Sequence, residues 1–255
     1  MQDARPVPLG VGKLISDSFA LAVATAAPLG LVAVLPSVLE AALRLALFGM
    51  IAPSAILIGS AGGALSSLIL ALLYWPFAIA VSGTLCFCLY LKATGRQISL
   101  GGAFGATLSV VPVLILVNLA VLLVASLGFL LLVVPGLYAF AMYSCSVQGV
   151  VIERRGWGAL ARAAALSQGY RWSILGLLVL VTLILGLAGS LIGVMVTAFP
   201  QDGAGAPLTI FMMVLSALAS GAQLLVYTSL STVLYMRLRD IKEGTGREDV
   251  ARVFE

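Results

Sequence analysis

The sequence contains no histidine and few charged residues. Of its 255 residues only 9% are Asp, Glu, Lys or Arg, whereas an average soluble domain has about 25%. The absence of histidine removes the commonest metal ligand and the usual proton shuttle near neutral pH. The scarcity of charge excludes an ordinary cytosolic enzyme, a disordered chain and a nucleic-acid-binding module, because each of these needs a wetted polar surface.

Cysteine is also scarce. Cys86, Cys88 and Cys145 all lie in apolar runs, and neither a CxxC pair nor a histidine accompanies them. A disulfide framework and a zinc site are therefore not indicated. We interpret the three thiols as small buried hydrophobic groups, and we expect no cofactor.

Apolar residues, by contrast, make up 62% of the chain, and the mean hydropathy is +1.16. So much apolar surface cannot be hidden in one soluble core of this length. We predict an all-α fold, a polytopic six-helix transmembrane bundle of three helical hairpins, because uncharged runs of about 20 residues recur along the chain. The predicted spans lie at about 19–39, 65–91, 111–134, 137–152, 172–199 and 208–236 of a single transmembrane domain, 1–255, with a short tail at 240–255.

The turn between the third and fourth spans is predicted from one tripeptide. The uncharged run 97–152 is too long for one helix across a ~30 Å hydrocarbon core. Val134-Pro135-Gly136 is the natural break, because proline disfavours helix at the preceding residue and glycine permits a turn. The first apolar run is longer than the ~7–15 residues of a signal-peptide core, so we expect it to be a retained span.

Basic residues are strongly biased to one side of the predicted bundle. They precede the first span, lie between spans two and three and between spans four and five, and follow span six; among all Lys and Arg residues the exception is Arg44. Lys and Arg in short loops mark the cytoplasmic side of a membrane. We therefore predict that both termini are cytoplasmic.

A unit made of a short segment, a helix going out, a return helix and a basic exit occurs three times. The short segments are 11–19, 98–108 and 157–169. In the first, Val11, Leu14, Ile15 and Phe19 share a helical face, as in a helix that lies in the headgroup plane. Internal repeats are common in transporters, but hairpin duplication can build any helical membrane protein, so the repeat alone indicates no transport.

Two stretches of the chain carry a family resemblance. They contain Pro135-Gly136, Glu153, the run Ala159-Leu160-Ala161-Arg162-Ala163, then Leu166, Gly169, Arg171 and Trp172, and the closing run Leu234-Tyr235-Met236-Arg237-Leu238-Arg239-Asp240-Ile241-Lys242-Glu243-Gly244. In them the chain resembles bacterial integral-membrane proteins labelled glycerophosphodiester phosphodiesterase membrane domain, and the related YciC-like uncharacterised membrane proteins. The resemblance covers the six-span layout and is specific over 135–172 and 235–244. One departure is Ala163, where the family usually has serine.

This resemblance implies a fold and a place in the bacterial inner (plasma) membrane, but no activity. In some relatives the membrane domain is fused to a soluble phosphodiesterase barrel. These 255 residues leave no room for such a barrel and contain no histidine for its chemistry.

Four arginines surround the short segment between the fourth and fifth predicted spans: Arg154, Arg155, Arg162 and Arg171. A basic cluster at this level can hold anionic lipid headgroups at about 1 kcal/mol per charge, although the positive-inside rule alone also explains it. We expect Glu153 to pair with one of these arginines and to fix the end of the fourth span.

Polar groups within the spans are few. Asn118, Gln148 and Gln223 are the strongest, and each could line a pathway or hydrogen-bond across helices; we favour helix packing. Glu40 and Arg44, four apart on one helical face, are expected to form an ion pair, with a gate or solute contact as the alternative. Two small-residue pairs, Gly189 with Gly193 and Ala217 with Gly221, are expected to pack spans five and six together.

These observations favour a non-catalytic inner-membrane protein that supports the assembly, stability or lipid organisation of other membrane components. Its expected partners are membrane lipids and other integral membrane proteins, and not nucleic acid. The alternative is a permease or lipid-handling transporter. An intramembrane enzyme is least favoured, because the spans offer Ser, Thr, Tyr and Cys without a base. The tail, in which Val250, Val253 and Phe254 share a helical face, is either a docking helix or a frayed end.

Overall fold

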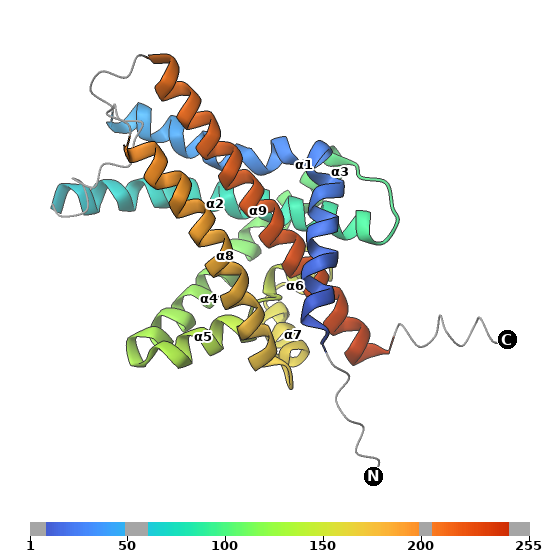
Figure 1. Cartoon of the computed structure of the whole chain (residues 1–255). Coiled ribbons are helices and arrows are strands. Elements are labelled where there is room, and N and C mark those ends of the chain that lie inside the picture. The colour runs from blue at the N-terminus through green and yellow to red at the C-terminus, as the bar shows by residue number, and fades with distance from the viewer. Residues whose placement is uncertain (1–8, 49–60, 199–205, 245–255) are drawn as a thin grey trace, which may run out of the picture.

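The structure is all-helical in the residues it describes. The computed structural model describes residues 9–48, 61–198 and 206–244, and every regular element there is a helix (Figure 1). The elements are α1 (Val11–Phe48), α2 (Ala61–Ala93), α3 (Leu100–Leu108), α4 (Val111–Leu131), α5 (Val133–Met142), α6 (Ser146–Val151), α7 (Gly158–Ser167), α8 (Arg171–Ala198) and α9 (Ala206–Glu243). Five of them, α1, α2, α4, α8 and α9, contain stretches long and apolar enough to cross a membrane. These helices indicate a multi-pass membrane protein.

The first and last helices pack against each other along most of their length. Leu14 near the start of α1 shares a buried cluster with Leu234 near the end of α9. Further along, Ser37 of α1 donates a hydrogen bond to the carbonyl of Ala217 near the start of α9, at 3.3 Å. The two helices are therefore antiparallel, and this contact is more extensive than that between α8 and α9.

The small residues on α9 explain this close packing. A Cβ added to Gly221 would lie 2.5 Å from the Val34 side chain of α1. The expectation that Ala217 and Gly221 pack spans five and six together is therefore wrong, because this side of α9 faces α1. Gly189 of α8 does face α9, since a Cβ there would lie 2.6 Å from the Gln223 amide nitrogen.

The turn between the third and fourth predicted spans lies slightly earlier than the predicted Val134-Pro135-Gly136. α4 and α5 form a tight hairpin whose turn is at Leu132, with extended backbone at φ −166° and ψ 154°. Pro135 lies in the first turn of α5, where proline is tolerated because the amide there has no partner within the helix. A Cβ on Gly128 would lie 2.8 Å from the Gly136 backbone, so glycine at both positions lets the two helices touch.

The helix predicted over 137–152 is in fact two short helices, α5 and α6, separated at 143–145. The backbone leaves helical dihedral angles at Tyr143 (φ −102°, ψ 10°) and Cys145 (φ −99°, ψ 14°), and the Ser146 amide donates to the Tyr143 carbonyl at 3.0 Å. Neither short helix reaches span length by itself.

Two of the three predicted short segments are separate helices. α3 and α7 lie within 98–108 and 157–169 and connect longer elements. The segment 11–19 is not separate, because it forms the first turns of α1 without a break. Proline does not by itself mark where a helix ends in this chain, because α1 continues through Pro28 and Pro36.

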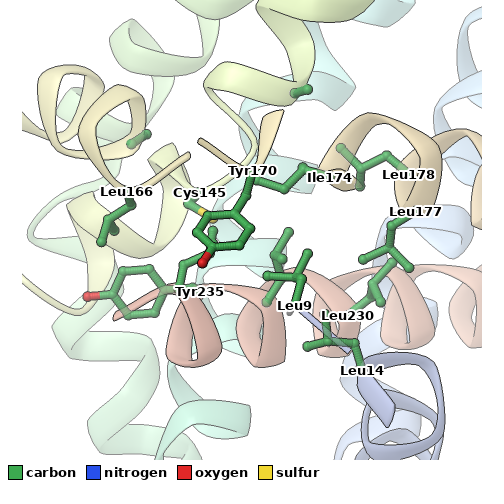
Figure 2. Close-up of a cluster of buried hydrophobic side chains, with 14 of the residues drawn as sticks. Leu9, Leu14, Cys145, Leu166, Tyr170, Ile174, Leu177, Leu178, Leu230 and Tyr235 are labelled. Atoms are coloured by element: carbon green, nitrogen blue, oxygen red, sulfur yellow. The ribbon is translucent and has the colours of Figure 1, made fainter. Parts of the chain in front are cut away.

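The largest buried cluster lies where the basic ends of the helices meet. Figure 2 shows the Tyr170 ring between Cys145 and Leu9, with Ile174 and Leu177 alongside. The three cysteines are buried and unbridged, as expected. Tyr235 is fully buried, but its hydroxyl points away from the apolar cluster (Figure 2), toward the charged groups described next.

Candidate functional site

Six side chains from three neighbouring segments form one polar cluster at the basic end of the molecule. We call it the Glu153 cluster; its members are Glu153, Arg155, Arg162, Tyr235, Arg239 and Glu243. Glu153 and Arg155 belong to the loop after α6, Arg162 belongs to α7, and the other three lie four residues apart along α9. This spacing places the α9 members on one helical face.

Glu153 is the centre of the cluster and is mostly buried, with an 11% exposed side chain. Arg162 donates to its Oε1 from Nε at 3.0 Å and from Nη2 at 2.9 Å. The Tyr235 hydroxyl donates to the same oxygen at 2.5 Å, and Arg155 Nε lies 2.5 Å from Oε2. The expectation that Glu153 pairs with a neighbouring arginine is confirmed.

Arg162 connects this carboxylate to the last turn of α9. Its Nη2 also donates to Glu243, whose other oxygen accepts from Arg239 Nε at 2.8 Å. The Arg162 side chain is 17% exposed. One guanidinium therefore holds the loop after α6 and the end of α9 together, which is the geometry that suits arginine better than lysine.

Local backbone features set the position of Arg162. Arg154 and Gly156 both have positive φ, 53° and 57°, so the chain turns sharply between α6 and α7. Ala159 and Ala163 are fully buried, and a Cβ on Gly149 would lie 3.1 Å from that of Ala159. Because these residues are small, α7 packs close to α6 and presents Arg162 toward α9.

The cluster keeps Glu153 ionised. Partial burial acts to raise its pKa, but the Tyr235 hydrogen bond and the charges of Arg162 and Arg155 outweigh it, and the net pKa is lowered below the ordinary value. For Arg162, burial opposes the charge, but Glu243 and Glu153 raise the pKa above its ordinary value. A carboxylate held in its anionic form by two cations is a poor general base, so this geometry favours a structural ion-pair network.

Arg171 belongs to a different contact. Its Nη1 donates to the Tyr138 hydroxyl at 2.5 Å, its Nη2 donates to the Ala164 carbonyl at 3.3 Å, and its guanidinium lies over the Tyr138 ring at 5.2 Å. Trp172 packs at a tilt against the same ring. Arg171 therefore ties the start of α8 to α5 and α7.

Arg154 is exposed and reaches back to α3. It donates to Ser109 Oγ and to the Ala106 carbonyl, both at 3.4 Å. The four arginines proposed as one headgroup site are thus divided: Arg155 and Arg162 contact Glu153, Arg171 contacts Tyr138, and Arg154 contacts the end of α3.

The three polar span residues are also separated. Asn118 donates to the Leu114 carbonyl of its own helix at 2.9 Å. Gln223 donates across to the Leu185 carbonyl of α8 at 2.8 Å, which is the packing role we favoured. Gln148 is fully buried in α6, and its Oε1 has no hydrogen-bond partner.

Three predicted features lie wholly or partly outside the described part of the chain. The predicted Glu40–Arg44 pair includes the Arg44 side chain, which is outside the described groups. The tail residues Val250, Val253 and Phe254 are outside them too. The partner of Gly189 in the other small-residue pair, Gly193, has its surroundings undescribed as well.

Sequence reasoning missed how the α9 residues join the cluster. Tyr235, Arg239 and Glu243 recur every four residues, a spacing that puts them on one helical face and that our predictions did not single out. The partner of that face was not evident, because Glu153 is 82 residues from Tyr235 along the chain. The stretches that carried the family resemblance, 135–172 and 235–244, meet here.

Among the described residues, no group of three or more Cys, Asp or Glu side chains is placed to hold a metal ion. The cluster's functional groups are one tyrosine hydroxyl, two carboxylates and three guanidinium groups, and the carboxylates are already engaged by the guanidinium groups. No family model, no curated protein and no solved structure matches this chain.

Proposed function

We propose that this chain is a non-catalytic protein of a bacterial inner membrane that organises anionic lipid and supports other membrane components. The observation that carries the proposal is a division of charge at the basic end. The Glu153 cluster joins α7 and α9, whereas a second set of cations, on helix ends and connections outside the cluster, is exposed: Lys13, Lys92, Arg96, Arg154, Arg237 and Lys242. Exposed cations at headgroup level attract anionic lipids.

The proposed topology is a set of out-and-back helices with both termini in the cytoplasm. In Figure 1 the α4–α5 turn and the helix ends next to residues 49–60 and 199–205 lie toward the left, and the start of α1 and the end of α9 lie toward the lower right. The exposed cations belong to the start of α1, the ends of α2 and α9, and the α2–α3 and α6–α7 connections, and we assign them to this second end. Under the positive-inside rule that end faces the cytoplasm, where anionic lipids are concentrated.

Membership of the glycerophosphodiester phosphodiesterase membrane-domain and YciC-like proteins is part of this proposal, as is the six-span count. In its support, the residues that carry the resemblance converge on the Glu153 cluster. The fourth predicted span, which completes the count of six, would be formed by α5 and α6 together. These two helices cover 133–151 with one interruption. Such a broken crossing is tolerated where protein surrounds the irregular backbone, and Cys145 and Ser146 at the break are buried.

A lipid-handling permease is the second candidate. It is favoured by the buried, unpartnered Oε1 of Gln148, because such an atom needs water or a ligand. It is disfavoured by Asn118 and Gln223, which make separate contacts on α4 and between α8 and α9. Gln148→Leu discriminates between the two: a permease loses transport of its substrate in vesicles, whereas a supporting protein retains its lipid and protein partners.

The experiment is gentle extraction into lipid nanodiscs followed by native mass spectrometry. We expect anionic phospholipids to be enriched over zwitterionic ones, and integral membrane proteins to be retained with the chain. A solitary particle with no lipid preference would overturn the proposal.

A further inference from the structure

The connection between α2 and α3 combines exposed cations with an exposed apolar helix face. Lys92, Arg96 and Ile98 line a shallow surface pocket of about 480 Å³, together with Gly95 and Gln97. Immediately after it, Leu100, Phe104 and Leu108 of α3 are exposed at four-residue intervals. Neither feature is used by the Glu153 cluster.

The pocket is built by the way α2 ends. Gly95 has φ 73°, its amide donates to the Lys92 carbonyl at 3.1 Å, and the Arg96 amide donates to the Leu91 carbonyl at 2.9 Å. These two bonds define a Schellman turn, which satisfies the last carbonyls of the helix. Lys92, Gly95 and Arg96 of this turn line the same pocket.

The two cations are available to a ligand. Within the described part of the chain neither Lys92 nor Arg96 forms an ion pair, and both are exposed. The stretch 61–152 contains no Asp or Glu at all. The pocket is therefore complementary to an anion, and α3 begins beside it with its amino end, where the Gly102 amide donates to Ser99 Oγ.

α3 is held so that its apolar face points outward. Its opposite face is small: Ala103 and Thr107 are buried, and a Cβ on Gly83 of α2 would lie 2.9 Å from the Thr107 methyl. At its other end the Ala106 carbonyl accepts from Arg154. Because α3 connects two helices of span length, α2 and α4, two membrane crossings there would place α3 beside the membrane surface.

We propose that the α2–α3 connection is a binding site for an anionic phospholipid of the cytoplasmic leaflet. Lys92 and Arg96 contact the phosphate of the headgroup, and Leu100, Phe104 and Leu108 contact the upper part of the acyl chains. Charge and apolar surface in this order along one short segment match a lipid from headgroup to tail. This site rests on the proposed function, because it needs the basic end to face the anionic leaflet.

The test compares the full chain in nanodiscs made of equal parts phosphatidylcholine and phosphatidylglycerol, with retained lipid counted by native mass spectrometry. Lys92→Ala with Arg96→Ala is the pocket variant. Lys13→Ala with Arg237→Ala is the matched control, which removes two exposed cations elsewhere at the same end. We expect the pocket variant to bind phosphatidylglycerol about thirty-fold more weakly, and the control to change by no more than a few-fold.

The outcomes separate the site from the function. Equal weakening in both variants, or none in the pocket variant, overturns the site but leaves the lipid-organising function in place. No preference for phosphatidylglycerol in the unaltered chain overturns the proposed function as well. A photo-crosslinking residue at Phe104 adds a direct readout: a phospholipid adduct supports the site, and an adduct with another protein chain overturns it.

Discussion

Glu153 contacts Arg155 of its own loop, Arg162 of α7 and Tyr235 of α9. Replacing Glu153 should therefore weaken the contacts among all three segments. Glu153→Gln keeps the shape but leaves Arg162, 17% exposed, with one carboxylate fewer. We expect a loss of about 1–3 kcal/mol in the free energy of unfolding, because a charged hydrogen-bond partner of a mostly buried group is lost.

The matched control for this variant is Arg155→Gln. Its side chain is 54% exposed, and exposed ion pairs contribute about 0–1 kcal/mol. Thermal unfolding in a mild detergent measures both. Equal stability of the two variants would show that the cluster does not hold α7 to α9.

The pH dependence of stability provides an independent check on the same carboxylate. The pKa of Glu153 is lowered in the folded protein, so its contribution is fully present above its ordinary value of 4.5 and is lost as the pH falls through the lower, folded pKa. We expect the difference in Tm between the unaltered chain and Glu153→Gln to shrink between about pH 5 and pH 3. A difference that is constant over this range would mean that the carboxylate charge contributes nothing.

At the level of single helices, the sequence predicts the position of a helix best where a long apolar run determines it. All five span-length helices coincide with predicted spans, since about 20 apolar residues have few other solutions in lipid. The fourth span was less predictable, because no glycine or proline marks its interruption at 143–145. The partner of the Tyr235 face was not predictable at all, because contacts between distant segments leave no period in the sequence.

The α4–α5 hairpin depends on two glycines, and this can be tested with a matched pair of alanine substitutions. A Cβ on Gly128 would meet the Gly136 backbone at 2.8 Å, and backbone cannot move aside as a flexible side chain can. A Cβ on Gly186 of α8 would meet nothing within 4 Å. We expect Gly128→Ala to lower the free energy of unfolding by about 1–3 kcal/mol, and Gly186→Ala to leave it unchanged or raise it by up to about 1 kcal/mol.

Thermal unfolding of both variants in the same nanodisc distinguishes packing from helix propensity. Alanine favours a helix over glycine at either position, so propensity alone predicts that both variants are stabilised. Parallel behaviour of the two would therefore argue against the close approach of α4 and α5.

For the whole molecule, the antiparallel contact of α1 with α9 brings the start of the first helix and the end of the last to one end of the structure. Leu14 and Leu234 share a buried cluster there, and Lys13 and Lys242 at the same two helix ends are exposed. If that end faces the cytoplasm, then Arg96 and Lys242 lie inside the cell, and Asp202, between α8 and α9, lies outside. The three native cysteines are buried, so an introduced cysteine can be labelled over a low background.

We expect a membrane-impermeant maleimide added to intact spheroplasts to label Asp202→Cys, and to label Arg96→Cys and Lys242→Cys only after the membrane is opened. The physical reason is the cost of moving clustered Lys and Arg residues across the bilayer, which fixes their side during insertion. Labelling of Arg96→Cys from outside would reverse the orientation, and the anionic-lipid proposals would fail with it, because the basic end would then face the wrong leaflet. Labelling of Arg96→Cys and Lys242→Cys from opposite sides would instead contradict the proposed topology, in which the α2–α3 connection and the end of α9 lie on one side of the membrane.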